Sequence, residues 1–251
     1  MKLNTKDFGV ILLRIGTMLQ ASGASSNRIR ITIDRIANQY KFKSDLLITH
    51  RALILTLSDE NGPVFNQTKR NSAPGVNFKI VSGISRMSWR ITAQKWSLDQ
   101  IEVELNRLES IPHYHRLIIL LTVSLAGASF CRLGNGNLAA MAVAFIGTFA
   151  GLFIRQEAHK RKYNPYLTIF LAALTATLVA GAFRRIFPDS DLEMGFAASV
   201  LFLIPGVPLI NSFVDLFDGN ILNGIIRATN SLLIAFMIAL GMVCSLLLFK
   251  I

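Results

Sequence analysis

The stretch that decides the fold is LFLIPGVPLINSFVDLFDGN, Leu201 to Asn220. It begins as an apolar membrane helix would begin, and then places Pro205, Gly206 and Pro208 within four residues. Each proline lacks an N–H group, and its ring clashes with the preceding helical turn. Interrupted backbone inside a membrane persists only where protein buries it or where it lines a wet cavity. The stretch therefore predicts a broken membrane helix, as in many transporters, and a simple kink held by neighbouring helices is the alternative.

The composition places a membrane domain in the second part of the chain. Of the 251 residues, 52% are hydrophobic and only 16% are charged, whereas soluble domains keep about a quarter of their residues charged. Residues 1–116 carry 17 Lys and Arg against 9 Asp and Glu, and residues 117–251 carry 9 against 6. We therefore expect a soluble, basic α+β domain over residues 1–112 and an α-helical membrane domain over residues 113–251.

Five apolar stretches are long enough to cross a bilayer, which takes about 20 residues. They cover residues 114–132, 137–155, 165–183, 194–214 and 226–248. The second contains Gly147 and Gly151, a GxxxG spacing that lets two helices approach closely. The partner helix could belong to this chain or to another one, and the spacing does not decide between them.

The first 112 residues alternate between helical and strand patterns. Apolar residues recur with helical spacing over 5–21, 26–40, 83–95 and 98–108, the last opening on a capping box at Ser97 and Gln100. Short apolar and β-branched runs predict strands over 46–49, 52–57, 64–68 and 76–81. Loops are expected at 58–63 and 71–75, where Gly, Pro, Asn, Asp and Ser gather. This order predicts an α+β domain and not a dinucleotide-binding unit.

The loops indicate an orientation in the membrane. No signal peptide is expected, since Arg14 interrupts the first apolar run. The loop after the second span holds four basic residues, namely Arg155, Lys160, Arg161 and Lys162. By the positive-inside rule this loop and the N-terminal domain face the cytoplasm, and the C-terminus faces outside. The anionic inner leaflet of the bilayer accounts for the basic charge of the domain, so no nucleic-acid partner is expected.

Polar residues follow the broken helix and form the candidate site. Asn211 comes about one turn before Asp215, and Asp218 follows. An acid within a membrane span is costly and is by default a functional hypothesis. Asp215 is therefore interpreted either as a proton- or substrate-coupling group or as an interfacial acid paired with Arg227. We predict a substrate and ion pathway formed by Pro205, Gly206, Pro208, Asn211, Asp215, Asp218 and Arg227.

Enzyme motifs are missing from the sequence, which contains no Walker A, HExxH or nucleophile-elbow pattern. No metal or other cofactor is expected, and Cys131 and Cys244 lie in apolar segments as small buried side chains. Two alternatives remain open for the N-terminal domain: a membrane-tethered hydrolase, for which His50 is the only histidine in the body of the domain, or a ligand-sensing protein.

The sequence resembles the threonine/serine exporter family over nearly its whole length. The resemblance rests on the run from Ala197 to Gly219, which includes Pro-Gly-Val-Pro-Leu-Ile-Asn, and on the run from Ser124 to Gly136. Further similarity lies at Ser22 to Ser25 with Arg28, and at Asn71 to Phe78. The chain is most similar to the larger subunit of the bacterial two-component type, implicated in succinate export.

This resemblance implies a multi-pass subunit of the bacterial inner membrane that exports small polar metabolites, either threonine and serine or C4-dicarboxylates such as succinate. It also implies a smaller membrane subunit of the same family as partner, beside the small-molecule substrate and the lipid bilayer. A homo-oligomer of such a complex is left open. Because no nucleotide-binding motif is present, an ion gradient is expected to supply the energy.

Overall fold

The computed structural model describes residues 4–60, 62–71, 75–112, 114–187 and 192–249. Its chain forms two compact units. The first runs up to Pro112 and also takes in Gly206–Ala228. The second runs up to Pro205 and resumes at Thr229. The segment that follows the proline break thus folds with the N-terminal residues.

The first unit combines four N-terminal helices with a small sheet. Its helices are α1 (Thr5–Ala21), α2 (Ser26–Gln39), α3 (Phe78–Gln94) and α4 (Leu98–Glu109). Its strands are β1 (Lys43–Ile48), β2 (Ala52–Asp59) and β3 (Gly62–Arg70), antiparallel in the order β1-β2-β3. The unit also contains α9 (Gly206–Phe217) and the first part of α10 (Ile221–Phe249). The α+β prediction for this part of the chain is confirmed.

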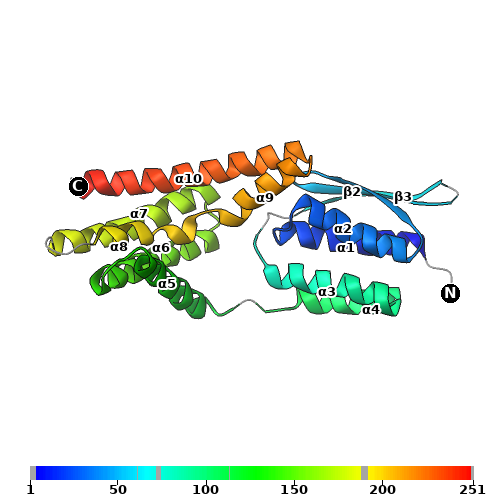
Figure 1. Ribbon diagram of the computed structural model, residues 1–251, viewed down its shortest axis with the longest axis horizontal. Coiled ribbons are helices and arrows are strands. Elements are labelled where there is room, and N and C mark those ends of the chain that lie inside the picture. The colour runs from blue at the N-terminus through cyan, green and yellow to red at the C-terminus, as the bar shows by residue number, and fades with distance from the viewer. Residues whose placement is uncertain (1–3, 61, 72–74, 113, 188–191, 250–251) are drawn as a thin grey trace. The chain divides into compact units, whose positions relative to one another are not determined.

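The core of the first unit lies between the sheet and the helices. Along β2 every second side chain is buried, which is the pattern of a strand with one face on a core. In Figure 1 the sheet covers one side of α1 and α2, and α3 and α4 lie on their other side. The apolar stripes of the helices fill the space between these layers, with Phe8, Leu12, Ile15, Ile29, Ile33, Ile36, Ile84 and Met87 fully or almost fully buried.

The predicted fourth strand over 76–81 is wrong, because α3 already begins at Phe78. The Asn77 side chain accepts the N–H groups of Lys79 and Ile80 and so caps the helix. The next buried side chains, from Val81 onward, recur with helical spacing. A short apolar run cannot by itself distinguish a strand from the first turn of a helix. Residues 61 and 72–74 of the two predicted loops lie outside the described residues.

The second unit is a bundle of apolar helices. It comprises α5 (Arg116–Leu133), α6 (Leu138–Lys160), α7 (Pro165–Ile186), α8 (Glu193–Ala198), the 3₁₀ helix η1 (Leu201–Leu203) and α10 from Thr229 onward. Small residues line its tightest contacts. A Cβ atom on Gly147 would stand 3.0 Å from the carbonyl oxygen of Ala176, and one on Gly151 would stand 2.7 Å from that of Ala172. Both glycines of the GxxxG spacing therefore lie against α7 of the same chain.

Four helices in the described part of the chain are long and apolar enough to span a membrane: α5, α6, α7 and α10. The pair formed by Glu193–Leu203 and Gly206–Phe217 passes the same test together but is bent at its break. Four or five spans result, at positions close to those predicted from the sequence. The structure is that of a multi-pass membrane protein with a small sheet in its N-terminal part.

Candidate functional site

The helical backbone is interrupted next to the first of the two prolines. The 3₁₀ helix η1 ends at Leu203, Ile204 adopts an extended conformation with φ −59° and ψ 125°, and α9 begins at Gly206. Pro208 lies in the first turn of α9, where a proline removes no helical hydrogen bond. Only one interruption, at Ile204 and Pro205, therefore separates η1 from α9.

Beyond the break, α9 directs two polar side chains toward the segment between α1 and α2. The spacing of four residues places Asn211 and Asp215 on one face of α9. The Asn211 amide donates to the carbonyl oxygen of Gly23 at 2.7 Å. The Asp215 carboxylate accepts the backbone N–H of Ser26 at 2.9 Å through Oδ1. Ser26 is the first residue of α2, so Asp215 satisfies an amide that a helix leaves without an internal partner.

The first turns of α10 add a cation and an amide to this site. Arg227 Nε lies 3.3 Å from Asp215 Oδ2, and an Arg227 terminal nitrogen donates to the carbonyl oxygen of Ala24 at 3.2 Å. Asn223, one turn earlier, donates to the carbonyl oxygen of Ile48 at 2.8 Å. The polar cluster is defined here as Ser26, Asn211, Asp215, Asn223 and Arg227. It joins α9 and α10 to the start of α2 and the end of β1.

The polar cluster is well shielded from solvent. Asp215 is 0% exposed, and the Arg227 side chain is 16% exposed. Within the described residues, Asp215 Oδ2 and Asn223 Oδ1 are buried oxygens without a hydrogen-bond partner. The 3.3 Å approach of Arg227 Nε to Asp215 Oδ2 thus meets the distance of an ion pair but not the geometry of a hydrogen bond. A proton could bind Oδ2 without displacing an existing hydrogen bond.

The structure brings together three of the seven predicted pathway residues, Asn211, Asp215 and Arg227. Asp218 does not join them, because it is exposed just after the end of α9. Pro205, Gly206 and Pro208 contribute the break and the start of α9 but no side-chain group to the cluster.

Sequence reasoning missed Ser26 and Asn223. Ser26 directly follows Ser25, which caps α2 by accepting the N–H of Arg28, and a serine at the start of a helix carries no signal beyond capping. Asn223 stands four residues before Arg227 in an otherwise apolar segment, a helical spacing that could have suggested a shared face. No local pattern indicates contact between segments almost 190 residues apart.

His50, on which the hydrolase alternative rests, lies between β1 and β2. Partial burial, together with the positive charges of Arg51 and Arg227, lowers its pKa below the ordinary histidine value. Among the described residues, no three His, Cys, Asp or Glu side chains are grouped so that they could hold a metal ion. The lowered pKa favours the neutral form of the His50 side chain beside these two cations.

The chain matches the model of the family described as "Putative threonine/serine exporter" over residues 10–249. Two curated relatives are both called "Probable succinate transporter subunit YjjP". The protein from Klebsiella aerogenes is 31% identical over 201 residues, which cover 79% of this chain and 77% of the relative. The protein from Escherichia coli K12 is 29% identical over 239 residues, which cover 94% and 92%.

No solved structure matches this chain. The family and the relatives indicate a transporter subunit and not an enzyme, so the hydrolase alternative is not supported.

Proposed function

Because the chain belongs to the threonine/serine exporter family, we propose that it is one subunit of a secondary active exporter of small polar metabolites. The substrate is either threonine and serine or a C4-dicarboxylate such as succinate, in keeping with the names of the family and of the relatives. The transport site is formed by the polar cluster, at the helix α9 that follows the break in the fourth predicted span. The N-terminal residues and the polar cluster face the cytoplasm, as the basic loop after α6 suggests.

The observation that carries this proposal is the buried ion pair of Asp215 and Arg227. Burying two charges costs more free energy than their attraction returns unless further hydrogen bonds satisfy them. A chain that needed only a tight contact between α9, α10 and α2 could use apolar side chains at lower cost. A buried ion pair between these helices therefore supports a function in which one of the two charges is neutralised and then restored.

In the proposed mechanism, a proton and a substrate carboxylate each bind one partner of the pair: the proton binds Asp215, and the carboxylate binds Arg227. A proton on Asp215 Oδ2 removes the negative charge beside Arg227. The guanidinium then has a positive charge to offer, and a carboxylate is the group that it binds best. Both proposed substrate classes carry a carboxylate. Binding of substrate is thereby coupled to protonation, so substrate and proton cross the membrane together, and a proton gradient directed outward drives export without a nucleotide.

A second subunit is part of this proposal. The two relatives are named as subunits, and four or five spans form a small membrane domain. We propose that a smaller membrane protein of the same family completes the pathway. The assembly within the bilayer is then a heteromer, of which several copies could associate.

The experiment is efflux from vesicles that contain this chain with and without the smaller subunit. Vesicles preloaded with labelled threonine or labelled succinate are diluted into unlabelled buffer at a fixed proton gradient. We expect efflux of one of the two compounds, only when both subunits are present, and faster under a proton gradient directed outward than after that gradient is collapsed. Efflux that continues unchanged after the gradient is collapsed would contradict secondary active transport, and efflux by this chain alone would contradict the need for a partner.

A further inference from the structure

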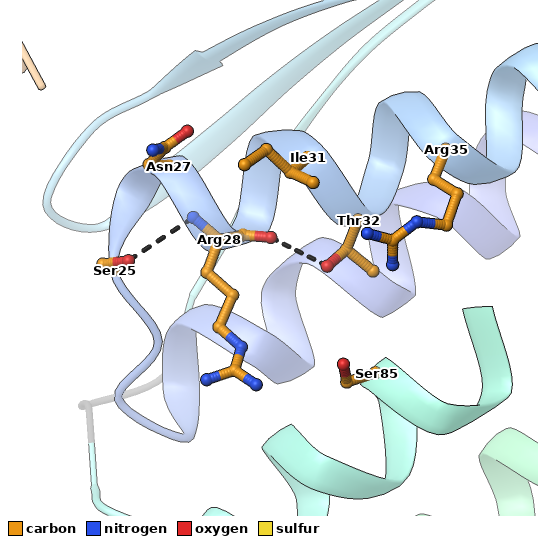
Figure 2. A pocket seen from close by; sticks show the side chains of 7 residues that line it. All are labelled: Ser25, Asn27, Arg28, Ile31, Thr32, Arg35 and Ser85. Atoms are coloured by element: carbon orange, nitrogen blue, oxygen red, sulfur yellow. Dashed lines mark hydrogen bonds between the residues drawn. The ribbon is translucent and has the colours of Figure 1, made fainter. Parts of the chain in front are cut away.

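The first unit contains a pocket that the transport proposal does not use. It has a volume of about 310 Å³ and is lined by Ser25, Asn27, Arg28, Ile31, Thr32, Arg35 and Ser85. This volume is at the lower end of the range for small-molecule sites, roughly 300–1,000 Å³. Figure 2 shows Arg28, Thr32 and Arg35 of α2 and Ser85 of α3 around one space.

The lining of the pocket is cationic and rich in hydroxyl groups. Arg28, Thr32 and Arg35 follow one another at spacings of four and three, so they share one face of α2. No acidic side chain lines the pocket. The acid of α2, Asp34, bonds the Ser44 hydroxyl at 2.5 Å and is not among the lining residues. Two positive charges thus meet hydroxyl groups and no internal counter-ion.

The two guanidinium groups differ in how firmly they are held. Arg35 donates to the Ser88 hydroxyl at 2.8 Å and lies 3.9 Å above the ring of Trp89, so its position is fixed. The Arg28 side chain is exposed, and no hydrogen bond or ion pair joins its guanidinium to the described residues. The Arg35 guanidinium is therefore already held in position to bind an anion, while the exposed Arg28 side chain can move to contact a ligand at the other end of the pocket.

The two arginines lie seven positions apart in the sequence, which places their Cα atoms about 10 Å apart along the helix. The spacing therefore sets one arginine toward each end of the face of α2 that lines the pocket. A short molecule with a carboxylate at each end can contact both guanidinium groups, because each guanidinium binds a carboxylate through two parallel hydrogen bonds. We propose that this pocket binds a small dicarboxylate, at a site separate from the polar cluster. The proposal does not depend on the transport mechanism.

The test is calorimetric titration of the full chain, purified in detergent, with succinate as the probe. Threonine and inorganic phosphate are titrated in parallel. Arg28→Ala removes one guanidinium of the pocket. Arg86→Ala is the matched control, because Arg86 is exposed and follows Ser85 directly but does not line the pocket. Thermal unfolding of each variant shows that it is folded.

We expect succinate to bind the chain, and we expect Arg28→Ala to weaken binding at this pocket at least about tenfold, since charge-assisted hydrogen bonds are lost. Arg86→Ala should keep the wild-type affinity, and threonine and phosphate should bind at least about tenfold more weakly than succinate. Lack of succinate binding at millimolar concentration would overturn the proposal. So would an equal loss in both variants, phosphate binding as tight as succinate binding, or an Arg28→Ala affinity equal to wild type, which would place the ligand elsewhere.

Discussion

Replacing Asp215 with asparagine is expected to lower the free energy of unfolding by about 3–5 kcal/mol, because it leaves the charge of Arg227 buried without its partner. Arg227→Gln should have a similar effect, since it leaves the fully buried Asp215 carboxylate uncompensated. The double variant Asp215→Asn, Arg227→Gln contains two neutral amides at the same places. It should be more stable than either single variant, and the double-mutant cycle should show strong coupling.

The measurement is denaturation of the purified chain in detergent, followed by circular dichroism and by a thermal scan. Asp218→Asn is the control, because this acid is exposed three residues further along the chain and takes no part in the hydrogen bonds and the ion pair that define the cluster. Additive losses, with the double variant less stable than each single variant, would contradict an ion pair between Asp215 and Arg227.

Replacing Gly151 with alanine is the second change with a large expected effect. The new methyl group would stand 2.7 Å from the Ala172 carbonyl oxygen and 2.8 Å from the Ala176 Cβ atom, both on α7. Overpacking of this kind costs about 1–3 kcal/mol, and here the obstacle is helix backbone, which cannot rotate away. We expect a lower midpoint of thermal unfolding and less folded protein in the membrane.

Gly206→Ala supplies the matched control, because nothing lies within 4 Å of the position where its Cβ atom would be. The same chemical change at this helical position should keep or slightly raise the stability, since alanine favours a helix by about 1 kcal/mol over glycine. An equal drop in the midpoint of thermal unfolding for Gly151→Ala and Gly206→Ala would contradict the close contact of 2.7 Å between α6 and α7.

Much of the fold could be predicted from the sequence, because it depends on local pattern. The capping box at Ser97 and Gln100 forms as expected and opens α4. Four of the five apolar runs overlap single helices that are long and apolar enough to span a bilayer, and the fourth run along the chain overlaps a pair of helices bent at its break. The strand predicted over 76–81 is wrong because only Val76 and the cap residue Asn77 precede α3, and the rest of the run forms the first turn of that helix. Runs of this length fit a strand and the first turn of a helix equally well.

The candidate site could be predicted only in part, because its partners come from distant segments. One interpretation of the sequence pairs Asp215 with Arg227, because an acid before a short turn and a base after it can form an ion pair. The carbonyl oxygens of Gly23 and Ala24 and the amide of Ser26 carry no sequence signal, since every residue has such groups. They become part of the site only because α9 and α10 fold with α2 in one compact unit.

The most direct test of the transport proposal is efflux by two variants that each lose one negative charge from the same turn of the chain. Asp215→Asn and Asp218→Asn are reconstituted with the smaller subunit, and release of preloaded threonine or succinate is measured under a proton gradient. The neutral double variant Asp215→Asn, Arg227→Gln shows whether a loss of efflux comes from unfolding. We predict that Asp218→Asn exports at the wild-type rate, while Asp215→Asn and the folded double variant release no more substrate than empty vesicles do. Export at the wild-type rate by the double variant would contradict a role of the buried charges in transport.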